Sequence, residues 1–329
     1  MFDAGQAAQL LRTNPDNTML TSGENTVSSH VEIGLRAPAQ AFSVIRLVAC
    51  FRLVRVLCHI VYGMLLACLY PLLHKSFQYH IVKSWSRELL QMMQIGLEAD
   101  ESDYSTSERG QLVVANHISW LDAVALNAVT PSFFVAKAEL LDWPLLGWMC
   151  KRIGTLFIKR DARRDAARIN REIAEMLRQG ENIALFPEGT TTDGRQLCHF
   201  HSSLLQGAID VDATISPIVI RYCDSAGHVN DDAVFVGEMT FIQSLWKMVC
   251  SPSLYIMVIH LPALACAGKA RRELAAEVQK SIDTALLKLL SGHPVSVPDN
   301  AALAIQQETI QPIYSLLLDP VLDQHKTQK

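Results

Sequence analysis

Short apolar segments alternate with amphipathic ones between residues 111 and 290, and this alternation constrains the fold more than any other feature of the chain. The predicted strands are QLVVANH (111–117), SFFVAK (132–137), GTLFIK (154–159), NIALF (182–186), ISPIVIRY (215–222) and SLYIMVIHLP (253–262). Helical patterns occupy 120–129, 161–180 and 268–290. Strands that alternate with helices predict an α/β fold, with a mixed, largely parallel sheet covered by helices.

The N-terminal region differs in composition and in the pattern of its apolar residues. Residues 1–40 are polar and without a sustained period, which predicts a mobile tail. Residues 56–73 are apolar except for His59 and are nearly long enough to span a bilayer. Basic residues on both flanks disfavour a single clean crossing and favour a helix hairpin that dips into one leaflet, with 76–97 as its second helix. A single transmembrane helix is the alternative. We therefore expect N-terminal membrane-anchoring helices over 41–98.

Composition narrows the class of protein. The net charge of −4 and the isoelectric point of about 6.3 argue against a nucleic-acid partner. Half of the residues are hydrophobic and the mean hydropathy is +0.17, which fits a globular protein attached to a membrane. The eight cysteines form no CxxC pair, and no secretory signal precedes them. We expect buried, reduced thiols and a domain on the cytoplasmic side.

The heptad NHISWLD places His117 and Asp122 five residues apart, between a predicted strand and a predicted helix. Within one helix these side chains would point about 140° apart. Ser119 as N-cap, with Asp122 in an S-x-x-D capping box, instead puts His117 in the turn and Asp122 in the first helical turn. The carboxylate then holds one imidazole nitrogen while the other faces a cleft, as a general base requires. The alternative is that Asp122 only caps the helix and that His117 is only a hydrogen-bonded turn residue.

A second loop, FPEGTTTDG (186–194), follows another predicted strand. Gly189 and Gly194 allow the backbone to approach a ligand closely. Glu188 stands at the carboxyl end of the strand, where open α/β sheets bind ligands. An ordinary turn is the alternative.

Basic residues gather around the predicted strand at 154–159, in a chain that is acidic overall. They are Lys151, Arg152, Lys159, Arg160, Arg163, Arg164, Arg168 and Arg171. Lys137 ends a neighbouring strand. This clustering suggests binding of phosphates or of an acidic carrier. For Arg164, Arg168 and Arg171 a solvated helix face is the more ordinary interpretation.

The run CHFH, with Cys198, His199 and His201, is the one candidate metal motif. Zinc sites need about four ligands at suitable spacing, and no second Cys/His pair accompanies this run. We therefore predict no metal. The chain also lacks a G-x-S-x-G elbow, a Walker loop and a G-x-G-x-x-G motif.

Four blocks in order, from Gln111 to Tyr222, resemble the glycerolipid acyltransferases that acylate lysophosphatidic acid and related lysolipids. NHISWLD resembles the family's NHxSxxD block, and FPEGTTTDG its FPEGT block. The stretch ending in GTLFIKR resembles the G-x-x-F-I-x-R block, and ISPIVI the short proline-containing block. The resemblance implies a glycerol-3-phosphate acyltransferase-like fold, with the acyltransferase domain over 99–295 and a C-terminal tail over 296–329.

The resemblance also implies roles for individual residues. His117 would be the general base and Asp122 would orient it. The lysolipid hydroxyl would attack the thioester of an acyl-CoA or acyl carrier protein, with no covalent acyl-enzyme and no cofactor. Gly189 and neighbouring amides would stabilise the oxyanion.

The same resemblance implies a binding site for the acceptor head group or the donor phosphates. The substrate-binding residues expected are Lys137, Arg160, Glu188, Gly189, Thr190 and Thr191. The enzyme would act on phospholipid precursors at the cytoplasmic face of a bacterial inner membrane.

One position departs from the family pattern. Members that act on lysophosphatidic acid usually have Arg after FPEGT, where this chain has Thr191. Threonine lacks the bidentate phosphate contact of a guanidinium. FPEGTTTDG resembles bacterial relatives that acylate lyso-ornithine lipid, so that acceptor is an alternative to 1-acylglycerol-3-phosphate. Two further alternatives are a non-catalytic lipid-binding protein and a thioester hydrolase.

Overall fold

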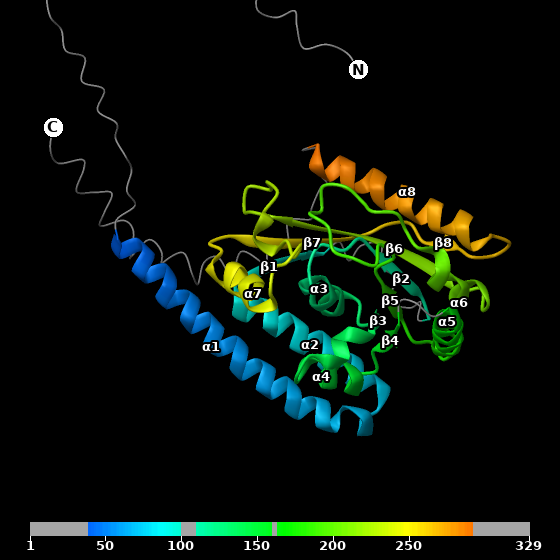
Figure 1. The fold of residues 1–329 in the computed structure, drawn as a ribbon, viewed down its shortest axis with the longest axis horizontal. Coiled ribbons are helices and arrows are strands. Elements are labelled where there is room, and N and C mark those ends of the chain that lie inside the picture. Colours follow the sequence, from blue (N-terminus) through cyan, green and yellow to red (C-terminus); the bar gives the residue numbers. More distant parts are fainter. Residues whose placement is uncertain (1–38, 100–109, 160–162, 292–329) are drawn as a thin grey trace, which may run out of the picture.

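A mixed, largely parallel sheet forms the centre of the protein in a computed structural model, which describes residues 39–99, 110–159 and 163–291 (Figure 1). The eight strands are β1 (Ile95–Ala99), β2 (Leu112–Ala115), β3 (Phe133–Lys137), β4 (Leu156–Ile158), β5 (Ile183–Leu185), β6 (Thr214–Cys223), β7 (Leu254–His260) and β8 (Leu264–Ala265). Their order is β1-β7-β6-β2-β5-β3-β4, with β8 beside β6. Only the pairs that β6 makes with β7 and β8 are antiparallel. The predicted fold class is confirmed.

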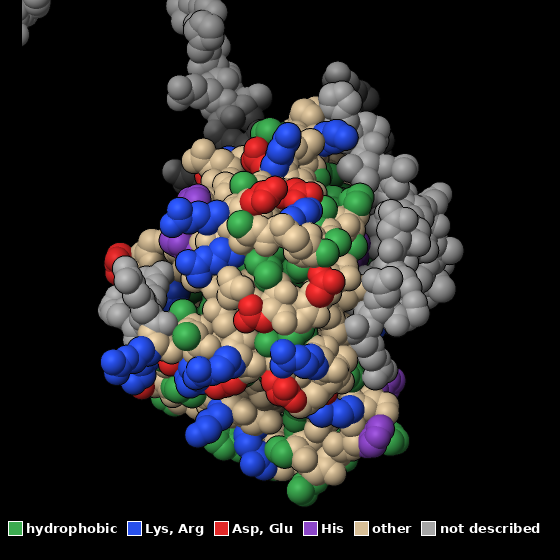
Figure 2. Space-filling model, turned by 90° about the vertical axis from the view of Figure 1, so that its right-hand side faces the viewer, with side chains coloured by type: hydrophobic (Ala, Val, Ile, Leu, Met, Phe, Trp, Pro, Cys, Tyr) green, Lys and Arg blue, Asp and Glu red, His purple; other side chains and the backbone are tan. Residues whose placement is uncertain are grey.

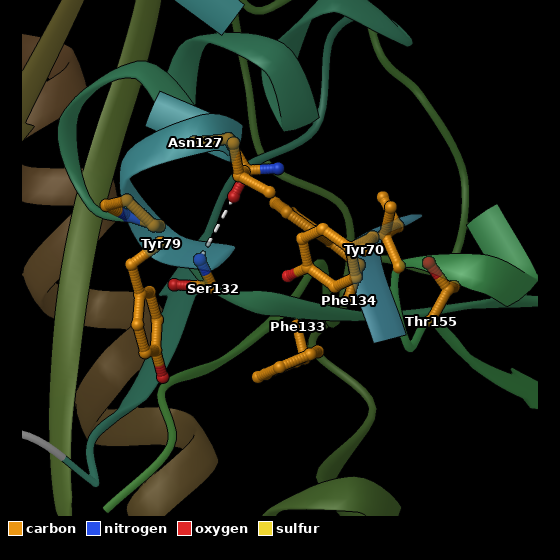
Figure 3. A pocket seen from close by; sticks show the side chains of 10 residues that line it. Tyr70, Tyr79, Asn127, Ser132, Phe133, Phe134 and Thr155 are labelled. Atoms are coloured by element: carbon orange, nitrogen blue, oxygen red, sulfur yellow. Dashed lines mark hydrogen bonds between the residues drawn. The ribbon is translucent and has the colours of Figure 1, made fainter. Parts of the chain in front are cut away.

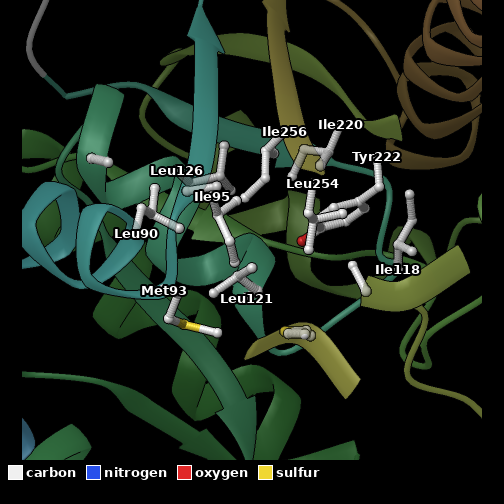
Figure 4. Close-up of a cluster of buried hydrophobic side chains, with 14 of the residues drawn as sticks. Leu90, Met93, Ile95, Ile118, Leu121, Leu126, Ile220, Tyr222, Leu254 and Ile256 are labelled. Carbon is white, nitrogen blue, oxygen red and sulfur yellow. The ribbon is translucent and has the colours of Figure 1, made fainter. Parts of the chain in front are cut away.

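Helices cover both faces of the sheet. The α-helices are α1 (Ala39–Leu69), α2 (Lys75–Met93), α3 (Leu121–Val129), α4 (Leu146–Arg152), α5 (Arg163–Arg178), α6 (Gln206–Ile209), α7 (Phe241–Cys250) and α8 (Arg271–Leu290). Short 3-10 turns lie at Tyr70–Leu72, Ala138–Asp142, Ser202–Leu205 and Asp231–Ala233. Side chains of β2 alternate between two cores, as a strand buried on both faces requires. One core packs against α2, α3 and α7 (Figure 4), and the other against α5 and α8.

Several sequence predictions need correction. The cysteines were expected to be buried, but Cys50, Cys58, Cys68 and Cys198 are exposed. The second N-terminal helix ends at Met93, not at residue 97, because Gln94 takes a left-handed conformation (φ 57°) and stops it. The next residues, Ile95–Ala99, form β1 on the edge of the sheet, parallel to β7. A strand of the sheet thus lies within the range assigned to the membrane anchor. The predicted tails, 1–40 and 296–329, fall outside the described residues except for the first two residues of α1.

The predicted N-terminal hairpin is present as α1 and α2, which run antiparallel (Figure 1). The segment Arg46–Leu72 is long and apolar enough to cross a membrane by length and composition. Its outward side chains are exposed, namely Leu47, Phe51, Val54, Leu57, Val61, Tyr62, Leu65 and Leu69. By contrast, charged side chains of both signs are spread among polar and apolar ones over the face of the molecule turned away from α1 (Figure 2). The choice between one crossing and a one-leaflet hairpin stays open.

One charged side chain ties α1 to the domain. Arg52 is 4% exposed although it stands in the apolar helix. Its guanidinium donates to the carbonyls of Val249 (2.8 Å) and Ser251 (3.1 Å) at the C-terminal end of α7, and to the side chain of Gln94. A cation at a helix C-terminus is favoured by the helix dipole. Arg52 therefore fixes α1 against α7 and against the residue that precedes β1.

Candidate active site

Two loops meet at one edge of the sheet because β2 and β5 are parallel neighbours. The heptad 116–122 follows β2, and the loop 186–194 follows β5. The carboxyl ends of parallel strands lie at the same edge, which is where α/β sheets carry their sites. The two sequence blocks singled out above are therefore brought together by the fold.

The predicted pair forms a direct hydrogen bond. His117 Nδ1 lies 2.8 Å from Asp122 Oδ2. The carboxylate is fully buried, whereas the His117 side chain is 22% exposed. The Phe186 ring stacks on the imidazole with centroids 4.0 Å apart. Since Nδ1 faces the carboxylate, it carries the proton, and Nε2 is left as the proton acceptor of the ring.

Asp122 reaches His117 by a different route from the predicted capping box. The helix α3 begins at Leu121 with Trp120 as N-cap, and no side chain caps it. The prediction of Ser119 as N-cap was therefore wrong. Only the carboxylate half of the box is present, since Asp122 Oδ2 accepts the main-chain N–H of Ile118 (2.7 Å) and of Ser119 (2.9 Å). These amides orient the carboxylate toward His117.

The loop after β5 clasps the main chain of His117 from both sides. Glu188 Oε1 accepts the His117 N–H at 2.8 Å, and the Thr192 N–H donates to the His117 carbonyl at 2.8 Å. Gly194, at φ 73°, packs so closely on Ile118 that a Cβ there would lie 2.6 Å from its Cδ1 atom. Glycine is needed for both the conformation and the approach. The position of the imidazole thus depends on the second loop.

The Glu188 carboxylate is 3% exposed and points into the protein. Its second oxygen, Oε2, accepts the N–H of Cys198 at 2.8 Å. Burial raises the pKa of the Glu188 carboxyl, and the bonds from Cys198 and His117 oppose that rise. Both oxygens therefore hold backbone, and substrate binding by Glu188 stays a prediction.

The other predicted site residues are less fully placed. Lys137 is exposed at the end of β3, and Arg160 lies outside the described residues. The N–H of Gly189 closes a turn on the Phe186 carbonyl at 3.1 Å. Thr190 is exposed in the loop, and the Thr191 hydroxyl donates to the Phe235 carbonyl. The oxyanion and head-group roles of these residues stay predictions.

Two residues of the site were not assigned roles from the sequence. Tyr222, in β6, donates its hydroxyl to Asp122 Oδ1 at 2.6 Å. The Asn116 side chain bonds the N–H and carbonyl of Ile220, at 2.8 and 2.9 Å. A phenol at the end of a buried apolar strand needs a polar partner. The tyrosine that ends ISPIVIRY could therefore have been predicted to bond a polar group of the site.

No group of three His, Cys, Asp or Glu side chains in the described ranges is arranged to hold a metal ion. In the CHFH run, the rings of His199 and His201 lie 5.9 Å apart, and His201 lies beside Gly189. A pocket at the opposite edge of the sheet, near the start of β3, is lined by Tyr70, Tyr79 and Phe134 among others (Figure 3). Its volume of about 20 Å³ leaves room for little more than a water molecule.

The fold and the site define the class of protein. Residues 96–221 match the family model described as Acyltransferase. The structure is similar to that of the 1-acyl-sn-glycerophosphate acyltransferase of Thermotoga maritima, with a TM-score of 0.50, 17% identity, and coverage of 72% of this chain and 97% of that one. At that identity the likeness shows the fold alone. With the family match, it identifies an α/β acyltransferase.

Relatives define the family more closely. The chain is 38% identical over 197 residues to the 1-acyl-sn-glycerol-3-phosphate acyltransferase of Neisseria meningitidis, covering 60% of this chain and 76% of that protein. It is 37% identical over 175 residues to the lyso-ornithine lipid O-acyltransferase of Pseudomonas aeruginosa, covering 53% and 67%. The chain belongs to the acyltransferase family of these two enzymes, as the sequence blocks predicted.

Proposed function

We propose that this enzyme moves a fatty acyl chain from a thioester to the free hydroxyl of a lysolipid. The observation that carries the proposal is the bond between His117 and the buried Asp122 carboxylate at the edge where both loops meet. A base whose tautomer is fixed by a buried carboxylate is suited to remove a proton from an alcohol. The relatives named above, which act on lysolipids, support the same acceptor class.

The reaction follows from this arrangement. His117 Nε2 takes the proton of the lysolipid hydroxyl as its oxygen attacks the thioester carbonyl. The tetrahedral intermediate then collapses, the carbon–sulfur bond breaks, and the imidazolium returns the proton to the leaving thiolate. Asp122 stabilises the imidazolium and stays ionised, as in related His–Asp pairs. The products are a diacylated lipid and a free thiol, so no acyl-enzyme forms.

The donor is an acyl-CoA or an acyl carrier protein, and no metal or other cofactor takes part. Both donors present a phosphopantetheine thioester, and Lys137 and Arg160 are the cations proposed to meet its phosphates or those of the acceptor. Amides of the segment Gly189–Thr191 are the proposed oxyanion donors.

The acceptor is 1-acylglycerol-3-phosphate or lyso-ornithine lipid. The structure adds one observation in favour of the second. Thr191, at the position where an arginine is expected for a phosphate, donates its hydroxyl to the Phe235 carbonyl. That side chain is thus committed to the backbone and supplies no phosphate clamp.

We place the enzyme on a membrane, at the cytoplasmic face of a bacterial inner membrane. The exposed apolar side chains of α1 support membrane attachment, because a surface of this extent is costly in water. The lysolipid acceptor is itself dissolved in the bilayer. We do not propose a nucleic-acid partner, because the chain carries a net negative charge.

The test is an acceptor panel with the purified full-length protein in lipid vesicles. Labelled acyl-CoA and labelled acyl carrier protein are each offered with 1-acylglycerol-3-phosphate, lyso-ornithine lipid or no acceptor. Formation of a diacylated lipid with one acceptor supports the proposal and identifies the substrate. Release of free fatty acid without acceptor would instead show a thioester hydrolase, and lysolipid binding without turnover would show a non-catalytic lipid-binding protein.

A further inference from the structure

The second oxygen of the Asp122 carboxylate has a dedicated partner. Three donors bond Oδ2, whereas the Tyr222 hydroxyl donates a hydrogen bond to Oδ1 at 2.6 Å. We propose that Tyr222 is a positioning residue for the reaction, whose hydroxyl orients the Asp122 carboxylate and sets the basicity of His117. This inference rests on the proposed function and adds a member to its catalytic apparatus.

The register of the sheet delivers Tyr222 to this place. The parallel pairing of β2 with β6 ends at Ala115 and Ile218, while β6 continues to Cys223. Beyond that point the Asn116 side chain acts in place of main chain, bonding both the N–H and the carbonyl of Ile220. Tyr222 is two residues further along the strand, on the same face as Ile220. Asn116 thus fixes how far Tyr222 projects beyond β2.

Tyr222 is held on its other side as well. It pairs with Ile256 of β7, and its carbonyl accepts the N–H of Asn230. The side chain is 2% exposed and lies among Ile118, Leu121 and Ile220 in the core shown in Figure 4. Burial and the neighbouring Asp122 charge hold the pKa of Tyr222 well above its usual value. The phenol therefore remains a protonated donor through the neutral pH range.

A hydrogen-bond donor on Oδ1 has two effects on the pair formed by Asp122 and His117. It fixes the rotation of the carboxylate so that Oδ2 faces Nδ1. It also draws negative charge toward Oδ1, which weakens the attraction between Asp122 and a protonated His117. Loss of the phenol should therefore strengthen the pairing of Asp122 with a protonated imidazole and move the acid limb of the pH–rate profile to higher pH. Other ionisable groups near the turn include Glu188, whose carboxylate accepts the His117 N–H, His201, beside Gly189, and Asp193, which follows the Thr192 that bonds the His117 carbonyl.

The experiment compares Tyr222→Phe with the wild-type enzyme in the full chain, with the pH profile of acyl transfer as the readout. We expect kcat to fall by about 10-fold, the scale of one hydrogen bond to a charged group. The acid limb of the profile should move up by about half a pH unit to one unit. KM for donor and acceptor should change by less than about twofold, since Tyr222 is buried away from substrate.

A double-mutant cycle distinguishes an effect of Tyr222 through Asp122 from a general destabilisation of the fold. If Tyr222 acts through Asp122, adding Tyr222→Phe to Asp122→Asn should cost little further activity. The matched control is Tyr79→Phe, because Tyr79 donates to the buried carboxylate of Glu181 at the opposite end of β5. That variant should lose stability and keep the wild-type pH profile.

A profile for Tyr222→Phe that superimposes on the wild type after scaling would overturn the proposal, and so would losses that multiply in the double mutant. If Tyr222→Phe does not fold, a ring-fluorinated tyrosine at position 222 keeps the hydroxyl and makes it a stronger donor. The acid limb should then move down, and an unmoved limb counts against the proposal. Failure of the proposed function looks different, since the wild-type enzyme itself would transfer no acyl chain.

Discussion

Asp122 and Glu188 are two buried carboxylates at the ends of neighbouring strands, and they do different work. Both accept main-chain N–H groups and both are nearly inaccessible to water. Asp122 also bonds an imidazole whose other nitrogen is available for chemistry, whereas Glu188 joins the His117 turn to the loop at Cys198. The comparison teaches that the role of a buried carboxylate at this edge depends on its partners: Asp122 bonds the side chain proposed to be the base, whereas Glu188 bonds two main-chain segments.

The largest effect is expected where the reacting group itself is removed. His117→Ala should lower the rate of acyl transfer by about 10³-fold to 10⁴-fold, the upper range for loss of a general base. The melting temperature should change little, because the side chain is partly exposed. The measurement is transfer of a labelled acyl chain, beside thermal unfolding.

The matched control for His117 is His228→Ala. His228 also pairs with an aspartate, Asp224, through Nδ1 at 3.3 Å, but it is exposed in the loop after β6. That variant should stay within about twofold of wild type, as surface substitutions usually do. Full activity of His117→Ala would remove the base from the mechanism and leave Asp122 without its distinguishing partner.

Asp122→Asn tests the carboxylate that serves the base. We expect a fall of about 10²-fold to 10³-fold in kcat, because an amide neither fixes the Nδ1 proton nor stabilises an imidazolium. The substitution is nearly isosteric, so most of the loss should be in kcat and not in KM. Steady-state kinetics with varied donor and acceptor measure this split. A loss confined to KM would contradict an orienting role.

Glu188→Gln tests the other carboxylate. An amide oxygen accepts one main-chain N–H, while the NH₂ group faces a second donor, so one of the bonds to His117 or Cys198 is lost. We expect about 1–3 kcal/mol of lost stability and a fall in kcat of about 10-fold. Amide hydrogen exchange should increase at residues 189–198. Unchanged exchange there would mean that Glu188 does not hold the two loops together.

Glu181→Gln is the control for Glu188, on the same strand. Glu181 is buried just before β5, where it bonds Lys75 at 2.9 Å and the Tyr79 hydroxyl. Its loss should also cost stability, but exchange at residues 189–198 should stay at the wild-type level. The pair of variants separates a buried carboxylate in general from one that links these loops.

The smallest expected effect is in the pH dependence of stability. Because the folded pKa of Glu188 is raised above its unfolded value near 4.5, its contribution is most favourable below that pH and is lost as pH rises through the folded pKa. The stability difference between wild type and Glu188→Gln should therefore widen toward acid. Thermal unfolding of both proteins between neutral pH and pH 4.5 measures it. A difference that shrinks toward acid would reverse the assigned sign.

Most strands and several helices could be predicted from the sequence. The alternating pattern predicted the six main strands and the helices α3, α5 and α8, since a strand buried on both faces is a short apolar run. The FPEGT loop and the heptad were predicted to act together, and parallel neighbours β2 and β5 explain why. The strand β1 was missed because Gln94 ends α2 with no glycine or proline to mark the end.

Roles of single side chains were harder to predict. Glu188 was expected to bind substrate, which stays a prediction. A carboxylate in a loop gives no sign that main-chain amides will bond both of its oxygens, as those of His117 and Cys198 do. Ser119 matched the capping pattern, yet the helix begins at Leu121 and Asp122 satisfies the amides. Tyr222 is a hundred residues from Asp122, and their contact depends on the register of β6 against β2. Such pairings are tertiary and leave no local pattern.

The hydrogen bonds of Arg52 fix the position of α1 relative to the rest of the domain. They join α1 to α7 and, through Gln94, to the start of β1. If α1 rests in a bilayer and the acceptor comes from it, as proposed, the depth of α1 sets the height of His117 above the lipid surface. A thicker or thinner bilayer would lift or lower the catalytic base relative to the lysolipid hydroxyl, which makes membrane thickness itself a variable in the reaction.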